Sequence, residues 1–223
     1  MVFDLEGTLV NAELFPEVGR RVGNGDLLTE ITNLAMNGDL KFEEAFFKRL
    51  NLIQGTSIGL VKDICLQLPL FSGVREAVDE LKSLNCRLAI FTGSFDFLAK
   101  RVAAELGIRH VLSNKFITER GVIVSARNPV VTPEVKAKRL MKLARRLNIT
   151  LDSCVAVGDG ANDIPMMELA GLSIAFNAKK PVEEIADVVI KGEDLRKILP
   201  HIKIFKKSKK GDGWKLRGRD YGD

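Results

Sequence analysis

The sequence predicts an α/β protein with a doubly wound parallel sheet and a helical block inserted after the first strand. Two observations support this prediction. From residue 69 onward, short apolar runs alternate with segments whose apolar residues recur every three or four positions. Residues 12–68, by contrast, carry the helical spacing almost throughout. Strands that alternate with helices form parallel sheets that helices cover on both faces.

The composition is that of a folded chain. Of the 223 residues, 46% are hydrophobic and 28% are charged, which excludes a disordered chain and a membrane protein. No apolar run approaches the ~20 residues of a membrane-spanning helix, and the acid at position 4 argues against a signal peptide. The three cysteines are odd in number and lack metal-ligand spacing. We therefore expect no disulfide framework and a reducing, cytoplasmic location.

The elements can be assigned in chain order from the periodicity. Residues 1–5 predict a first strand that is short for a central one, and residues 12–68 predict a helical cap. Beyond the cap we expect a helix at 73–84, a strand at 88–91, a helix at 95–106, a strand at 109–113 and a hairpin at 116–124. A helix from Pro133 follows. The remaining strands, at 153–157, 172–176 and 187–190, are each followed by a helix, at 163–170, 181–185 and 193–199. The expected domains are a core of residues 1–11 and 69–202, the cap at 12–68, and a basic flexible tail at 203–223.

Polar residues cluster where the predicted strands end, and ligands of open parallel sheets bind at the carboxyl ends of strands. These residues are Asp4, Glu6 and Thr8 after the first strand, Thr92, Gly93 and Ser94 after the second, Lys136 near the start of a helix, and the run from Gly158 to Asp163. Carboxylates and phosphate oxygens are ligands that Mg²⁺ prefers, while hydroxyl, backbone N–H and lysine groups hold phosphate oxygens. The pattern predicts a site for phosphate and Mg²⁺.

The segments DLEGTLV, TGS and GDGANDIPMM, together with Lys136, resemble the four motifs of the haloacid dehalogenase superfamily. Within that superfamily the sequence is most similar to the phosphoserine phosphatases, from about residue 3 to residue 202. GDGAND followed by an apolar helix is the most specific of these signals. A calcium loop, the alternative for this segment, requires an acid or amide where Ala161 stands.

The resemblance implies a Mg²⁺-dependent phosphomonoester hydrolase with a Rossmann-like core. Asp4 matches the nucleophile that forms an aspartyl-phosphate, and the resemblance also makes it a metal ligand. Glu6 matches the general acid and base, and its backbone carbonyl would also bind Mg²⁺. Asp159 matches the other direct metal ligand, and Asp163 matches a carboxylate that orients the waters around the metal.

The resemblance also implies how the substrate is held. Thr92, Gly93 and Lys136 would stabilise charge on the phosphoryl oxygens, and Asn162 would contact the substrate. Lys138 is the alternative to Lys136, because both stand in the first turn of the predicted helix, but the motif spacing favours Lys136.

Four residues of the predicted cap match the family's pocket for an amino acid. Glu13 would pair with the substrate ammonium, and Arg49 would bind its carboxylate with a planar fork. Met36 and Phe42 would line the pocket. An exposed salt bridge is the alternative for Glu13 and Arg49. The implied substrate is a small phosphorylated metabolite, O-phospho-L-serine, hydrolysed to serine and phosphate in serine biosynthesis.

The sequence departs from the family pattern at three positions. Glu6 stands where phosphoserine phosphatases usually have Asp, Thr92 replaces the commoner Ser, and Ser94 replaces a common Gly. The longer Glu6 leaves the phosphoryl acceptor open between water and an alcohol. A phosphotransferase, or a phosphatase for another small phosphorylated metabolite, is therefore the first alternative function.

The tail accounts for the net charge of +5. Residues 203–223 hold eight Lys/Arg against three Asp, which leaves 26 basic and 26 acidic residues in the rest of the chain. Trp214 and Tyr221 stand among these cations. A non-catalytic module that binds nucleic acid through this tail is the alternative from another class, but we expect a solvated extension. The oligomeric state, monomer or homodimer, stays open.

Overall fold

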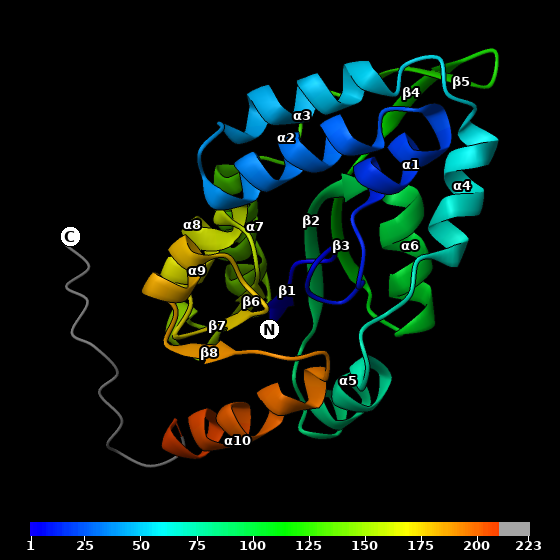
Figure 1. Cartoon of the computed structure of the whole chain (residues 1–223). Helices are drawn as coiled ribbons and strands as arrows, with labels where there is room; N and C mark the ends of the chain where they lie inside the picture. The colour runs from blue at the N-terminus through cyan, green and yellow to red at the C-terminus, as the bar shows by residue number, and fades with distance from the viewer. Residues whose placement is uncertain (210–223) are drawn as a thin grey trace.

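The computed structural model describes residues 1–209 (Figure 1). Its central sheet has the strand order β3-β2-β1-β6-β7-β8, and every pairing within it is parallel. The strands are β1 Val2–Phe3, β2 Ala89–Phe95, β3 His110–Asn114, β6 Val155–Gly158, β7 Leu172–Phe176 and β8 Val188–Ile190. The predicted doubly wound α/β fold is confirmed.

Helices cover both faces of the sheet, and the central strands β1, β2, β6 and β7 bury side chains on both sides. In β1, Phe3 packs into one hydrophobic cluster and Val2 into the other. The first cluster is covered by α5 Val74–Ser83, α6 Asp96–Glu105 and α10 Leu199–Ser208. The second is covered by α7 Pro133–Arg146, α8 Ile164–Leu169 and α9 Lys180–Ile185. This double burial explains why the strands read as unbroken apolar runs.

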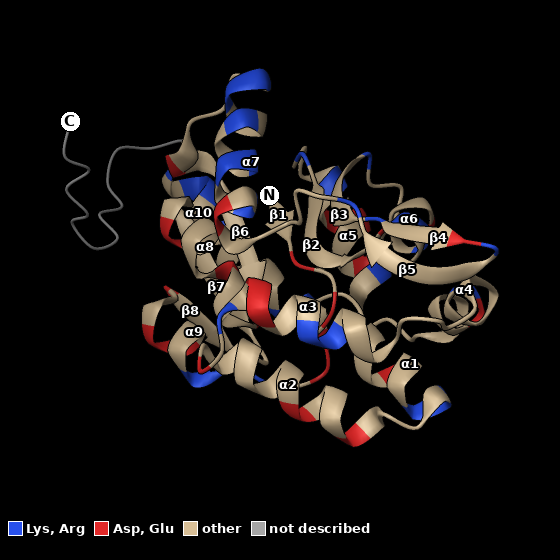
Figure 2. Cartoon of the chain, turned by 90° about the horizontal axis from the view of Figure 1, so that it is seen from above, with Lys and Arg blue, Asp and Glu red and all other residues tan. Residues whose placement is uncertain are grey.

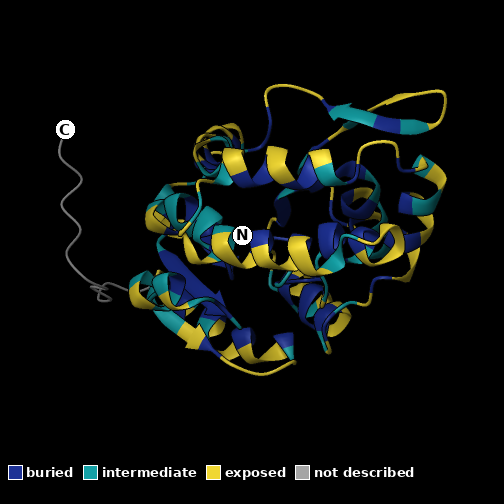
Figure 3. Cartoon of the chain, turned by 45° about the horizontal axis from the view of Figure 1, so that its top comes forward, coloured by how far each residue is buried: buried dark blue, intermediate teal, exposed yellow. Residues whose placement is uncertain are grey.

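The block expected to be helical contains α1 Leu14–Val22, α2 Gly25–Asn37, α3 Phe42–Leu52 and α4 Ile58–Gln67. We refer to these four helices as the cap. They lie over the end of the sheet at which the strands stop (Figure 1). The outward faces of α2 and α3 are exposed while the opposite faces are buried (Figure 3). That these helices form a separate domain stays a prediction.

The expected hairpin forms as β4 Phe116–Glu119 and β5 Val122–Ala126, and it is bonded to the cap. The Gly55 N–H donates to the Ile123 carbonyl at 2.8 Å, and the Ile123 N–H donates to the Thr56 carbonyl at 2.9 Å. The hairpin comes from the sequence between two core strands, but its backbone is paired with the segment between α3 and α4.

Several elements differ from their predicted bounds. β1 is shorter than expected, since the chain turns directly after Phe3. β2 continues past residue 91 to Phe95, with an irregular register between Phe91 and Phe95, so the TGS segment lies within the strand rather than after it. The predicted helix at 193–199 is a 3-10 turn, Leu195–Ile198, that leads into α10.

The expectation of a flexible tail from residue 203 is wrong for its first residues. α10 runs to Ser208 because Ile202 and Phe205 bury their side chains. Residues 210–223, with Trp214, Tyr221 and the nucleic-acid contact considered for them, lie outside the described residues. Between residues 1 and 209, no helix combines the length and the apolar character that crossing a membrane requires.

Helix α7 contains Lys136, one of the predicted site residues. The start of this helix is determined by the residues directly before it and in its first turn. The Thr132 hydroxyl accepts a hydrogen bond from the Val135 N–H at 3.3 Å, and Pro133 begins the first turn. We expect Thr132→Ala to lower the free energy of unfolding by about 1 kcal/mol, because the hydrogen bond between the Val135 N–H and the Thr132 hydroxyl at the start of α7 is lost. Urea unfolding followed by circular dichroism measures it. Thr132→Ser keeps the hydroxyl and is the control; an equal loss in both variants would contradict the capping role.

Candidate active site

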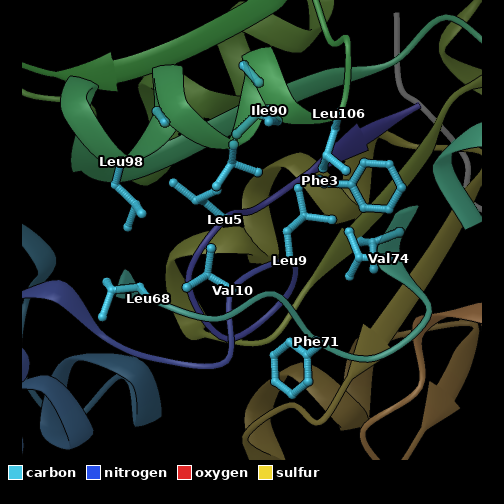
Figure 4. Close-up of a cluster of buried hydrophobic side chains, with 14 of the residues drawn as sticks. Phe3, Leu5, Leu9, Val10, Leu68, Phe71, Val74, Ile90, Leu98 and Leu106 are labelled. Atoms are coloured by element: carbon cyan, nitrogen blue, oxygen red, sulfur yellow. The ribbon is translucent and has the colours of Figure 1, made fainter. Parts of the chain in front are cut away.

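The turn after β1 points its polar side chains away from the core. Leu5, Leu9 and Val10 have no exposed surface and pack with Phe3 in the core cluster (Figure 4). The N–H groups of Leu9 and Val10 both donate to the Leu5 carbonyl at 2.8 Å, which closes the turn. Asp4 and Glu6, which alternate with these apolar residues, therefore reach the end of the sheet.

Gly7 makes this turn possible. Its φ is 71°, in the left-handed region, and a Cβ there would lie 2.0 Å from Oδ2 of Asp159. The next residue, Thr8, donates from its hydroxyl to Oδ1 of Asp159 at 2.9 Å. The close approach of the turn thus places the β1 carboxylates beside the carboxylate that follows β6.

Three buried carboxylates meet at this point. Oxygen atoms of Asp4, Asp159 and Asp163 all lie within 4.8 Å of one another. Seen from the cap, acidic segments occupy the middle of the molecule, whereas the exposed part of α7 is largely basic (Figure 2). Glu6 is outside this cluster, and its expected metal contact through the backbone carbonyl stays a prediction.

Lys136 lies behind Asp4 and joins two of these carboxylates. Its Nζ is 3.0 Å from Oδ1 of Asp4 and 2.8 Å from Oδ1 of Asp163, and its exposed fraction is 0%. Burial by itself lowers the pKa of an ammonium, but Asp163 and Asp4 together outweigh it, and the pKa of Lys136 lies above its ordinary value. Lys138, the alternative in the sequence, is exposed.

Two of these carboxylates, Asp159 and Asp163, have raised pKa values because they are buried together. Burial raises the pKa of Asp163 to about 7, with Asp4 adding to the rise and Lys136 opposing it. Burial, and then the charges of Asp4 and Asp163, raise the pKa of Asp159 well above its ordinary value. The backbone N–H groups of Asp159 and Gly160 donate to Oδ2 of Asp163 at 3.2 and 3.4 Å. A divalent cation would compensate this negative charge.

Glu6 lies at the edge of the pocket between core and cap. Its Oε1 accepts hydrogen bonds from the Ser94 hydroxyl at 2.6 Å and from the Leu14 N–H at 3.1 Å. Burial is the main cause that raises the pKa of Glu6, against the opposing effect of these two hydrogen bonds.

The TGS segment is fixed by a side chain of β3. Asn114 donates from Nδ2 to the Gly93 carbonyl at 2.7 Å and accepts from the Val131 N–H at 2.8 Å. The Thr92 hydroxyl accepts from the Ser94 N–H at 2.9 Å. A Cβ on Gly93 would lie 2.7 Å from Phe42 of the cap. Any larger residue at position 93 would therefore displace the Phe42 ring.

Two charged residues of the cap face the same pocket. Arg49 is 7% exposed and lies 4.8 Å from the Phe15 ring centroid, with its Nη1 donating to Thr32 at 3.2 Å. The exposed salt bridge considered for it is therefore wrong. Burial raises the pKa of Glu13 well above its ordinary value, with Glu6 and Asp159 adding to the rise. Within residues 1–209 no ion pair joins Glu13 to Arg49, and both residues line the pocket.

The pocket is lined by residues of both core and cap: Asp4, Glu6, Glu13, Phe15, Ala35, Met36, Phe42, Arg49, Thr92, Gly93, Ser94, Asp159 and Asn162. The structure thus brings together all the predicted site residues, with Lys136 and Asp163 buried behind Asp4. Thr8, Ser94 and Asn114 also fix the site, although no role was predicted for them from the sequence. Thr8 and Ser94 stand inside the quoted motifs, which is a signal for them, whereas nothing in the sequence distinguishes Asn114.

This fold and this arrangement of carboxylates agree with the comparison to known families. A sequence model of the haloacid dehalogenase-like hydrolases matches residues 1–171. The chain therefore belongs to the haloacid dehalogenase-like hydrolase family.

Its relatives include several phosphoserine phosphatases. The one from Methanocaldococcus jannaschii is 36% identical over 204 residues, which cover 91% of this chain and 97% of that protein. The one from Archaeoglobus fulgidus is 35% identical over 196 residues, which cover 87% of this chain and 57% of that protein. This chain thus spans little more than half of the second relative.

Solved structures of phosphoserine phosphatases are also similar to this chain. A phospho-aspartyl intermediate analogue of phosphoserine phosphatase has a TM-score of 0.88 and 36% identity, over 90% of this chain and 97% of that one. A substrate-bound phosphoserine phosphatase complex has a TM-score of 0.87 and 36% identity, over 90% and 96%.

The raised pKa of Asp163 predicts how stability depends on pH. In the unfolded chain this carboxyl titrates near pH 4, but in the folded chain it titrates at about pH 7. Between these values the folded state binds the proton more tightly, so raising the pH removes stability. In chelator-treated protein, we expect the Tm of wild type to fall more between pH 5 and pH 8 than that of Asp163→Asn. Thermal melts at each pH measure this; parallel curves for the two proteins would contradict it.

Proposed function

We propose that this chain hydrolyses O-phospho-L-serine to L-serine and phosphate, with Mg²⁺ as cofactor and an aspartyl-phosphate on Asp4 as the intermediate. The observation that carries the proposal is the composition of one pocket. Asp4 lies at its core side, and Glu13 and Arg49, with opposite formal charges, line its cap side. This set matches a substrate that has a phosphate, an ammonium and a carboxylate. The phosphoserine phosphatases among the relatives support it.

The donor set fits Mg²⁺. This cation prefers a few carboxylate oxygens, with water and phosphate oxygens at its remaining positions, and three buried carboxylates are gathered within reach of one ion. Asp4, Asp159 and the backbone carbonyl of Glu6 would hold it, and Asp163 would orient its waters. When bound, the ion supplies positive charge that offsets the charge of the phosphate.

The first half of the reaction uses Asp4 and Glu6. A carboxylate oxygen of Asp4 attacks phosphorus, and the bond from phosphorus to the serine oxygen breaks. The electron pair of that bond stays on the serine oxygen, which takes a proton from Glu6. Burial of Glu6, which raises its pKa, favours the protonated form that this step requires.

The second half returns the site to its starting state. Glu6, now a carboxylate, takes a proton from a water molecule, and the water oxygen attacks the phosphorus of the aspartyl-phosphate. The bond between phosphorus and the Asp4 oxygen breaks and phosphate leaves. Through both halves, Thr92, the Gly93 N–H and Lys136 stabilise charge on the phosphoryl oxygens.

The cap selects the substrate. The ammonium of phosphoserine would lie beside Glu13 and restore its ionised form, since a nearby cation lowers the pKa of a carboxyl. The Arg49 guanidinium is held by Thr32 and by the Ala45 carbonyl, so it is already positioned to accept a carboxylate. Asn162 contributes a further polar contact from the core.

Replacing the nucleophile tests the reaction. We expect Asp4→Asn to lower phosphate release from O-phospho-L-serine by more than about 10³-fold, because an amide oxygen is a poor nucleophile. Phosphate release in the presence of Mg²⁺ is the measurement, with excess EDTA as the metal control. Wild-type protein that releases no phosphate from phosphoserine, or an Asp4→Asn variant that retains turnover, would overturn the proposal.

Substrate selection is tested by comparing two esters. We expect Glu13→Gln and Arg49→Lys each to raise KM for phosphoserine about tenfold. The kcat/KM for p-nitrophenyl phosphate, which has neither an ammonium nor a carboxylate, should stay within about twofold. Glu44→Gln, on the exposed side of α3 in a surface pair with Lys48, is the matched control. Equal losses on both esters would remove Glu13 and Arg49 from selection.

A further inference from the structure

Ser94 contacts the carboxyl group of Glu6 directly. The side chain lies in β2, is 5% exposed, and donates from Oγ to Oε1 of Glu6 at 2.6 Å. The Leu14 N–H, at the start of the cap, donates to the same oxygen at 3.1 Å. Both hydrogen bonds that Glu6 receives from the described residues therefore end on Oε1.

Two donors on one oxygen decide where a proton can reside. A carboxyl oxygen has two lone pairs in the plane of the group, and Oε1 uses both to accept from Ser94 and Leu14. The proton of the acid form is consequently placed on Oε2. The same two contacts also limit rotation of the side chain, because the donors belong to two different elements, β2 and the start of α1.

We propose that Ser94 is a positioning residue that fixes Oε1 of Glu6 and thereby presents Oε2 as the proton-carrying oxygen. The inference rests on the proposed function, in which Glu6 protonates the serine oxygen. In that step the Oε2–H bond breaks, the proton joins the leaving oxygen, and Glu6 keeps the electron pair as a carboxylate. Glu6 and Ser94 are also two of the positions at which the sequence departs from the family pattern, and the structure places them in direct contact.

The leaving group distinguishes this role from a merely structural one. The serine oxygen is a basic alkoxide that must be protonated as it leaves, whereas p-nitrophenolate leaves without a proton. We expect Ser94→Ala to lower kcat for phosphoserine about ten- to a hundredfold, with KM within about twofold, because the acid is misplaced. The kcat/KM for p-nitrophenyl phosphate should stay within about twofold of wild type.

A double-mutant cycle tests whether Ser94 acts through Glu6. If it does, Ser94→Ala adds no further loss for phosphoserine when Glu6 is already alanine. Ser94→Thr keeps the hydroxyl and should recover most of the activity. Ser83→Ala, which removes an exposed hydroxyl bonded to the Glu80 carbonyl, is the control and should match wild type on both esters. If thermal melts show that Ser94→Ala is unfolded, Ser94→Cys takes its place, because a cysteine is similar in volume to serine but is a weaker hydrogen-bond donor.

The outcomes separate this inference from the function on which it rests. Equal losses on the two esters, or losses that add in the cycle, overturn the positioning role while phosphoserine hydrolysis by wild type stands. A wild-type enzyme that releases no phosphate from phosphoserine overturns the proposed function itself. Selective loss on phosphoserine, absent in the Glu6→Ala background, supports both.

Discussion

The ammonium of Lys136 lies between two carboxylates in a region with almost no solvent, and the arrangement of the site depends on it. A buried carboxylate without a partner destabilises a fold by several kcal/mol. Lys136 compensates part of the charge of Asp4 and Asp163, and the start of α7 holds it in place. Because one ammonium contacts two of three clustered carboxylates, the cluster has more acidic groups than cations, and a bound metal ion would offset the difference.

The topology brings these acids together from distant parts of the sequence. The chain runs outward from β1 through β2 to β3 and then returns to β6 on the other side of β1. The crevice of a doubly wound sheet lies where the strand order reverses, here between β1 and β6. Asp4 and Asp159 follow these two strands. β1 has only the residues Val2–Phe3, yet it is paired on both sides, with β2 and with β6.

Much of this arrangement could be predicted from the sequence. The apolar runs of the central strands are strong signals because these strands are buried on both faces. Asp4 and Asp159 stand out because each follows such an apolar run directly. The extension of β2 to Phe95 could not be predicted, because Gly93 interrupts the strand signal. The segment is fixed instead by a hydrogen bond from Asn114, which lies 21 positions further along the chain. The contact between Ser94 and Glu6 spans 88 positions, and local patterns carry no information on such pairs. α10 passes residue 203 because Phe205 is buried, although the charge pattern there indicates a solvated segment.

The pairing between the cap and the β4–β5 hairpin bears on how such proteins diversify. The chain enters and leaves the four cap helices at adjacent points, where the Asn11 N–H donates to the Pro69 carbonyl at 2.9 Å. Because the entry and exit points are adjacent, residues 12–68 alone would be an insertion that recombination could exchange in one piece. However, backbone hydrogen bonds join Gly55 and Thr56 to Ile123 of the hairpin. The segment that packs as one unit is therefore larger than residues 12–68. A chimera that replaced the helices and their connecting loops alone would have to re-form these backbone hydrogen bonds with a hairpin from another protein.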